Sequence, residues 1–207
     1  VELSNYALEQ GADGVMVISP YYFSLPESAI LNFYGTLAER VHGPLLLYNF
    51  PDRTGHDLTP DMIYKLVSEH ENIVGIKDTV ATMGHTRAII QKVKTEYPDF
   101  LVYSGFDEFF GHNVLSGGDG SNFAPEVASG DAKAARQDDL KAMTEYQQKI
   151  DSLMAIYDVA PQFIPTIKKA MVVRGVNMEA LCTQPLLPAT EEETEEIQKI
   201  LQKAGLK

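Results

Sequence analysis

The stretch Ile73-Val74-Gly75-Ile76-Lys77 decides the predicted fold, because four apolar or small residues lead without a polar break to a lysine. The stretch Leu45-Leu46-Leu47-Tyr48 has the same form and ends on a tyrosine. Short apolar runs of this kind are typical of strands buried in a parallel sheet. Parallel strands end at the same edge of their sheet, so the Lys77 amine and the Tyr48 phenol are predicted to emerge together.

Strand-like segments recur along the first half of the chain, and each is followed by a helix-like segment. The predicted strands are 14–19, 44–50, 72–77 and 100–104, with a short fifth segment at 121–125. The predicted helices are 2–10, 27–41, 59–69, 83–97 and 107–115. Strand ends 27 to 29 residues apart indicate a βα repeat and a parallel sheet. A βα barrel and an open doubly wound sheet both fit this period.

The remainder of the chain has a helical pattern. Helices are expected over 128–157, 163–173 and 190–202, the last one starting at Thr190 with glutamates in its first turn. We therefore divide the chain into a βα-barrel portion, 1–127, and a C-terminal helical region, 128–207, packed on the barrel.

Composition excludes several classes of function. A net charge of −12 argues against nucleic acid as a partner. The single cysteine, Cys182, allows no internal disulfide, and no apolar run reaches the ~18–20 residues of a membrane span. The five histidines have no metal-ligand spacing, so no metal is expected. With no signal peptide visible, a soluble cytoplasmic protein is predicted.

The residues at the strand ends suggest carbonyl chemistry. A lysine partly desolvated by apolar neighbours can be neutral and can attack a ketone to form a Schiff base, and a tyrosine beside it can carry protons. Arg53, in the loop after Tyr48, offers a fork that suits a carboxylate. The competing interpretations are an exposed surface lysine, a solvated loop arginine and an Asn49 that only bonds its own turn.

Six motifs, taken in order, resemble those of a known family. They are Gly11-Ala12-Asp13-Gly14, Pro20-Tyr21-Tyr22, Tyr48-Asn49-Phe50-Pro51, Gly75-Ile76-Lys77-Asp78-Thr79, Ser104-Gly105 and Gly117-Gly118-Asp119-Gly120. By these motifs the chain resembles the dihydrodipicolinate synthase/N-acetylneuraminate lyase family of class I, pyruvate-dependent aldolases. The resemblance runs from Val1 to the C-terminal helices. It implies a (β/α)8 TIM barrel with extra C-terminal helices, in a homo-oligomer that is a tetramer or a dimer.

The resemblance also implies roles for single residues. Lys77 would be the Schiff-base lysine, Tyr48 the proton-relay tyrosine, and Tyr22 the tyrosine that reaches into a neighbouring subunit. Arg53 matches the arginine that holds the aldehyde's carboxylate in dihydrodipicolinate synthases. The residues expected to line the substrate site with it are Asn49, Thr79 and Gly105. The implied partners are a small keto acid and an aldehyde, and no cofactor is needed because the iminium itself accepts electrons.

The sequence departs from the family pattern in several places. The first three βα units and their pyruvate-binding loop are not in it, and it starts on Val1. Gly120 runs directly into Ser121, and Val127 into Ala128, where family members carry a strand and a helix. We therefore expect residues before Val1 and internal segments to be missing from this sequence.

Four interpretations remain open from the sequence. Asp78-Thr79 and Phe50 resemble the 2-keto-3-deoxy sugar-acid aldolases most, and this is the interpretation that we favour. Arg53 points instead to a dihydrodipicolinate synthase that condenses pyruvate with aspartate semialdehyde. The chain could also be a non-catalytic barrel that binds a keto acid, or an unrelated βα protein in which Lys77 is merely exposed.

Overall fold

The computed structural model describes residues 1–121 and 139–206 of the chain. The chain divides into two compact units, Val1–Ala124 and Pro125–Lys207, and each is described by itself. The predictions for the segment 122–138, including the junction of Val127 with Ala128 and most of strand 121–125, lie outside the described residues.

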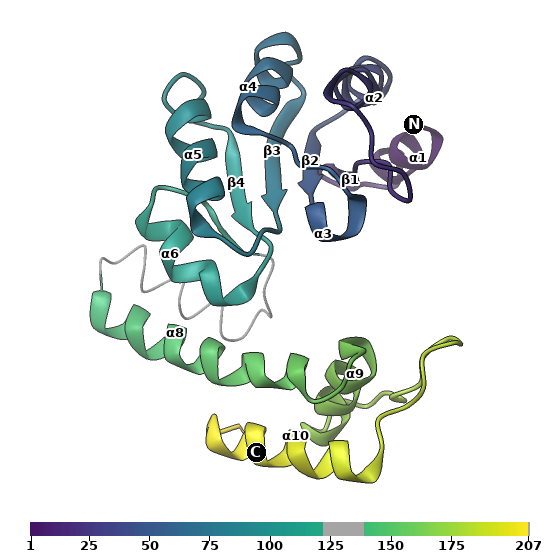
Figure 1. The fold of residues 1–207 in the computed structure, drawn as a ribbon, viewed down its shortest axis with the longest axis vertical. Helices are drawn as coiled ribbons and strands as arrows, with labels where there is room; N and C mark the ends of the chain where they lie inside the picture. Colours follow the sequence, from purple (N-terminus) through teal and green to yellow (C-terminus); the bar gives the residue numbers. More distant parts are fainter. Residues whose placement is uncertain (122–138, 207) are drawn as a thin grey trace. The chain divides into compact units, whose positions relative to one another are not determined.

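The first unit is a parallel sheet with helices between its strands (Figure 1). Its strands are β1 (Val15–Ile18), β2 (Leu45–Asn49), β3 (Ile73–Asp78), β4 (Leu101–Ser104) and β5 (Gly120–Ser121). Every neighbouring pair is parallel, and the strands follow one another in sequence order. A doubly wound sheet reverses its strand order at a switch point, whereas a barrel keeps it, so this order favours the barrel.

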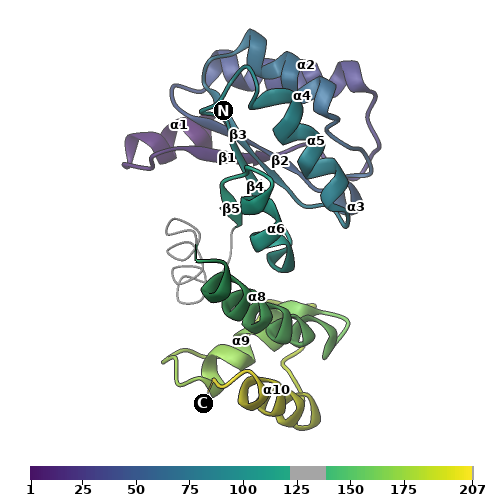
Figure 2. The ribbon, with the colours of Figure 1, turned by 90° about the vertical axis from the view of Figure 1, so that its left-hand side faces the viewer.

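Helices cover one face of this sheet. The helices of the unit are α1 (Glu2–Glu9), α2 (Glu27–Arg40), α3 (Pro51–Thr54), α4 (Pro60–Glu69), α5 (Met83–Val93) and α6 (Phe110–Leu115), with the short 3-10 helix η1 (Asp107–Phe109). Figures 1 and 2 show α2, α4 and α5 side by side over the strands. Their apolar stripes bury Tyr34, Ile63 and Ile89 against Leu47 and Ile76 of the sheet.

Local sequence explains where most of these helices begin and end. The Thr59 side chain accepts a hydrogen bond from the Met62 amide, and Pro60 occupies the first turn of α4. Helix α5 ends at Val93, earlier than the predicted Tyr97, in a turn before Pro98. The four-residue helix α3 was not predicted, although Pro51 at its start and the left-handed Gly55 after it are helix-end signals.

The second unit is helical. Its described elements are α8 (Leu140–Met154), the 3-10 helix η2 (Ala155–Asp158), α9 (Phe163–Val173) and α10 (Glu191–Lys203). Ile156, Ala170, Ile197 and Leu201 form its buried core. Helix α10 begins with a capping box in which Thr190 and Glu193 bond each other's backbone amides. Among the described residues, no helix is both long enough and apolar enough to cross a bilayer.

Candidate active site at the carboxyl ends of the strands

Three polar side chains occupy the same level of three neighbouring strands. Tyr48 of β2 pairs in register with Lys77 of β3, and Lys77 pairs with Tyr103 of β4. Side chains at paired positions of a sheet point to the same face. This is the face opposite the buried Leu47, Ile76 and Val102, which contact the helix layer. The predicted meeting of Lys77 with Tyr48 is thus a feature of the sheet register.

The Lys77 amine lies directly against the phenol ring. Its Nζ atom is 4.2 Å from the centroid of the Tyr48 ring, and both residues are partly buried. No ion pair among the described residues involves Lys77. The arrangement therefore suits a nucleophilic amine next to a proton carrier.

Thr79 and Gly105 form a tight contact just beyond these strand ends. A Cβ atom at Gly105 would lie 1.8 Å from Oγ1 of Thr79, so only glycine fits beside this side chain. The backbone holds both residues in place, through hydrogen bonds from the Thr79 amide to Asn49 O and from the Gly105 amide to Asp78 O. Thr79 Oγ1 is buried and has no hydrogen-bond partner in the part of the chain that the structure describes. A buried hydroxyl of this kind is available to a ligand.

Arg53 lies on helix α3 at the start of the loop after β2. Its guanidinium carbon is 5.8 Å from the centroid of the Phe50 ring, and the residue is exposed. Phe50 in turn stacks on Tyr48, with ring centroids 6.1 Å apart. The loop thus presents a cation on an aromatic surface that continues from Tyr48.

Asn49 faces away from Tyr48 and lies in a buried polar network. Its Nδ2 atom donates to Asp57 Oδ1 at 2.8 Å and to Asp78 Oδ1 at 2.9 Å, and its Oδ1 accepts from the Leu58 amide at 3.0 Å. The residue is 1 % exposed. These contacts engage both ends of the amide, so they support a role in holding the loop and the strand rather than a direct contact with substrate.

Tyr22 lies apart from these groups on an aromatic loop. It is 88 % exposed and has a positive φ of 87°, which is rare for a residue other than glycine. Its described ring contact is an edge-on one with Phe23, at 4.8 Å between centroids. A strained, projecting tyrosine of this kind is suited to contact another molecule.

A second polar row lies one residue further along the strands, on the helix side of the sheet. Successive residues alternate between faces, so each residue that follows a site-facing one points to the helices. The row consists of Ser19, Asn49, Asp78, Ser104 and Ser121, of which the first four are buried. Ser19 bonds His56 at 2.9 Å, and Ser121 donates to Asp107. The burial of this row explains why it carries so many hydrogen bonds.

His85 connects two carboxylates within this polar layer. Its Nδ1 donates to Asp78 Oδ2 at 3.0 Å, and its Nε2 lies 3.2 Å from Asp57 Oδ2. Burial alone would lower the pKa of His85, but the bonds and charges of Asp57 and Asp78 outweigh it and raise this pKa to about 10. Burial would likewise raise the pKa of Asp57, but the bonds from His85 and Asn49 lower it overall. The imidazole is therefore a cation at neutral pH.

Neither Tyr103 nor His85 was predicted from the sequence as a site residue. Tyr103 could have been found from a pattern that three strands share, an aromatic or lysine followed by a small polar residue, as in Tyr48-Asn49 and Lys77-Asp78. Burial, and to a lesser extent Asp119, raise the pKa of Tyr103. His85 had no comparable signal, because its two partners come from separate segments.

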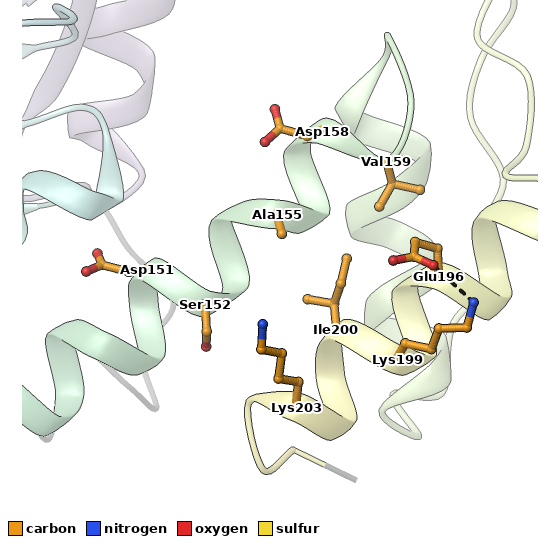
Figure 3. A pocket seen from close by; sticks show the side chains of 9 residues that line it. All are labelled: Asp151, Ser152, Ala155, Asp158, Val159, Glu196, Lys199, Ile200 and Lys203. Carbon is orange, nitrogen blue, oxygen red and sulfur yellow. Dashed lines mark hydrogen bonds and ion pairs between the residues drawn. The ribbon is translucent and has the colours of Figure 1, made fainter.

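Other parts of the described chain offer weaker sites. A hollow of about 550 Å³ in the second unit is lined by Lys199, Lys203, Asp158 and neighbours from α8, η2 and α10 (Figure 3). Lys199 pairs with Glu196 at 3.2 Å, so its charge is already matched. Within residues 1–121 and 139–206, no group of three or more His, Cys, Asp or Glu side chains is arranged to hold a metal ion.

The parallel sheet, with its strands in sequence order and a helix after each of the first four, defines a class of fold, the βα barrel. The family model described as the dihydrodipicolinate synthetase family matches residues 1–204, and the chain belongs to this family. Its relatives include a protein named probable 2-dehydro-3-deoxy-D-pentonate aldolase YjhH from Escherichia coli (strain K12), 39 % identical over all of this chain and 70 % of the relative.

Solved structures agree with this assignment. A crystal structure of YagE from E. coli K12, a prophage protein of the dihydrodipicolinic acid synthase family in complex with pyruvate, matches with a TM-score of 0.95 at 36 % identity. It covers 100 % of this chain, and this chain covers 71 % of it. The dihydrodipicolinate synthase from Thermotoga maritima matches with a TM-score of 0.91 at 28 % identity, with the same coverage. These likenesses confirm the predicted barrel fold and the predicted aldolase or lyase class.

Proposed function

We propose that Lys77 forms a Schiff base with pyruvate or with a 2-keto-3-deoxy sugar acid, and that the enzyme cleaves or forms a carbon–carbon bond with an aldehyde. The observation that carries this proposal is the 4.2 Å approach of the Lys77 amine to the Tyr48 ring at the carboxyl ends of the strands. Family membership supports it, because YagE, a member of the same family, has been crystallised in complex with pyruvate.

The proposed reaction proceeds through covalent intermediates on the Lys77 amine. The neutral Lys77 nitrogen attacks the C2 ketone of the keto acid, and loss of water gives an iminium. In the cleavage direction, the electrons of the C3–C4 bond flow into this iminium while the C4 hydroxyl loses its proton, which releases an aldehyde and leaves an enamine. Protonation of the enamine at C3, followed by hydrolysis of the resulting iminium, releases pyruvate. Tyr48 would carry these protons, since its ring lies against the amine.

The aldehyde half of the substrate would lie toward the loop after β2 and the Thr79–Gly105 contact. Arg53 would hold a negatively charged or hydroxyl-rich group there, because its guanidinium is exposed and free to form a bidentate pair. The unpartnered Thr79 hydroxyl would bond a substrate oxygen, and Gly105 leaves the space beside it. Asn49 would act from behind, by fixing the loop.

The relatives favour a sugar-acid substrate. YjhH, 39 % identical, is named a probable 2-dehydro-3-deoxy-D-pentonate aldolase, whereas the dihydrodipicolinate synthase of T. maritima is 28 % identical. The Asp78-Thr79 pair after the lysine points the same way. Arg53 supports the second candidate, condensation of pyruvate with aspartate semialdehyde, because a carboxylate-bearing aldehyde would need such a cation. A barrel that only binds keto acids would have an unreactive Lys77.

Assembly is part of the proposal. The projecting Tyr22, with Tyr21 at 69 % and Phe23 at 71 % exposure, would be buried by another copy of the chain in a dimer or tetramer. This would bring the Tyr22 phenol to the proton relay of a neighbouring subunit. Cytoplasmic location stays a prediction of the sequence.

Covalent trapping tests the central step. Borohydride added with pyruvate to the whole protein should reduce the imine and leave a stable adduct on the peptide that contains Lys77, as detected by mass spectrometry. An unchanged mass of that peptide would remove the Schiff-base proposal. A panel of aldehydes offered with pyruvate, including glyceraldehyde, glycolaldehyde and aspartate semialdehyde, would then separate the two candidate activities.

A further inference from the structure

His85 joins two segments that the proposed reaction requires to be in register. Asp78 directly follows Lys77 on β3, and Asp57 belongs to the loop that carries Arg53. The imidazole lies between their carboxylates, 3.0 Å from Asp78 and 3.2 Å from Asp57. It comes from the first turn of α5, so a third segment fixes its position.

The contacts around His85 form a closed cycle. Asn49 Nδ2 donates to both of the same carboxylates, at 2.8 Å to Asp57 and 2.9 Å to Asp78. The two carboxylates are thus bridged twice, by the Asn49 amide and by the imidazole. The Thr86 hydroxyl donates a further bond to Asp78 at 2.7 Å. Each buried oxygen of Asp78 therefore has a donor, as a fully buried carboxylate requires.

Within this cycle His85 supplies the positive charge. Asp78 has a fully buried side chain, and that of Asp57 is 41 % exposed. Without the imidazolium, two carboxylates would face each other across one amide and would repel each other. Asp57, on the loop, is the more exposed of the two carboxylates, so this repulsion would displace the loop rather than strand β3.

Tyr48 and Lys77 do not depend on this cycle for their own alignment. They lie on neighbouring strands that pair in register along Leu46–Asn49, so the backbone ladder aligns them without His85. The loop 50–58 has no such ladder, and it is joined to the end of β3 through Asn49, Asp57 and His85. The imine-forming pair and the aldehyde-binding loop are thus fixed by different interactions.

We propose that His85 is a positioning residue that fixes the Arg53-bearing loop against the end of strand β3, and so sets the aldehyde-binding half of the site without contacting substrate. This inference rests on the proposed function, because it takes the loop to bind the aldehyde half and Lys77 to bind the keto acid. It adds that two different structures position the two substrates. The sheet aligns the Lys77 amine that binds the keto acid, and the hydrogen-bonded cycle around His85 aligns the loop that binds the aldehyde.

The variant His85→Gln in the whole protein tests this role, because glutamine keeps a donor but removes the charge. Loss of the charged contacts that His85 makes should raise the KM for the aldehyde about tenfold, while the rate of pyruvate–borohydride trapping stays within about twofold. His112→Gln, an exposed histidine on α6, is the matched control and should change neither quantity. Equal losses in trapping and in the aldehyde step would overturn the positioning role.

A second variant and a double variant test the same role. Asp57→Asn removes the same ion pair from a partly exposed loop position, so it tests the role even where His85→Gln folds poorly. The double variant should be no worse than His85→Gln alone, since both substitutions break the contact between His85 and Asp57. Additive losses would contradict the role.

Amide hydrogen exchange measures directly how strongly the loop is held in place. The Leu58 amide, which donates to Asn49 Oδ1, should exchange about tenfold faster in His85→Gln, with β3 unchanged. This measurement needs no substrate. Unchanged protection of the loop overturns the role of His85, whereas absence of a trapped adduct in the unaltered protein overturns the Lys77 assignment alone.

Discussion

The Nζ atom of Lys77 lies 4.2 Å from the centroid of the Tyr48 ring, on the strand next to its own. The two residues are 29 positions apart in the sequence, yet they pair in the register of β2 with β3. A cation over an aromatic face is stabilised by the ring, and a neutral amine in the same place has its proton acceptor close by. This contact is the physical basis of the predictions about catalysis.

Removal of the Tyr48 hydroxyl should slow turnover and preserve the fold. The variant Tyr48→Phe keeps the ring against Lys77 and removes the proton carrier, so kcat should fall about 10²–10⁴-fold, the usual contribution of general acid–base catalysis. Steady-state kinetics measures the change. Tyr6→Phe, an exposed tyrosine on α1, is the control and should leave kcat unaltered. A kcat of Tyr48→Phe equal to that of the unaltered protein would show that protons travel by another route.

Arg53 should matter most for aldehydes that carry a carboxylate. Arg53→Ala removes an exposed guanidinium, and a bond between charged groups is worth about 1.5–3 kcal/mol, so kcat/KM for aspartate semialdehyde should fall about ten- to a hundredfold. Glyceraldehyde should be affected less. The matched control is Arg87→Ala, which removes a different exposed arginine, on α5. Equal losses for charged and neutral aldehydes would reassign Arg53 to the structure of its loop.

Gly105 should not tolerate even one added methyl group. In Gly105→Ala the new Cβ would lie 1.8 Å from Thr79 Oγ1 and 2.8 Å from Thr79 Cα, so Thr79 and its backbone must shift. Overpacking of this kind costs about 1–3 kcal/mol, which urea unfolding would measure. Gly84→Ala is the control, because no atom of the described residues lies within 4 Å of its added Cβ and alanine favours the helix. If both variants unfold at the same urea concentration, the Thr79 contact is not as close as described.

Stability should fall on the alkaline side of neutrality. The pKa of His85 is raised from 6.5 to about 10 in the folded chain, so its stabilising contribution is complete below about pH 6.5 and is lost as pH rises through about 10. The pKa of Asp57 is lowered from 3.8, so its contribution is present above this value and is lost in acid. The two windows together place the stability maximum between about pH 4 and pH 6.5.

Urea unfolding at pH 6 and pH 9 would measure this dependence. A decrease of about 1–2 kcal/mol is expected over that interval, discounted for the partial exposure of Asp57. In His85→Gln the decrease should shrink, because the titrating group is gone. The same slope in both proteins would mean that another group is responsible.

The sequence determined the order and type of most elements of the first unit. Apolar runs that end on Tyr48 and Lys77 predicted β2 and β3 within one or two residues, and the βα period predicted parallel pairing. Strand periodicity also predicts that the side chains of Tyr48 and Asn49 point to opposite faces of the sheet, since successive residues on a strand alternate between faces. Asn49 is predicted to line the substrate site, and this alternation puts its side chain on the face opposite Tyr48.

Local sequence signals predicted the structure less accurately in the loop after β2 and in the arrangement of the strands. The Pro/Gly loop after β2 contains the helix α3, because Pro51 suits the first turn of a helix even when only four residues follow. The choice between a barrel and a doubly wound sheet needed the strand order, which depends on contacts between segments rather than within them.

The chain's own residues were sufficient to point to an amine and a phenol at one edge of a parallel sheet, because hydrophobic runs and their spacing are local properties. Only the tertiary structure could bring Asp57, Asp78 and His85 together, since their positions in the sequence carry no common pattern. Their meeting is a consequence of burial: a carboxylate enclosed between sheet and helix needs a cation, and the fold determines which segment supplies it.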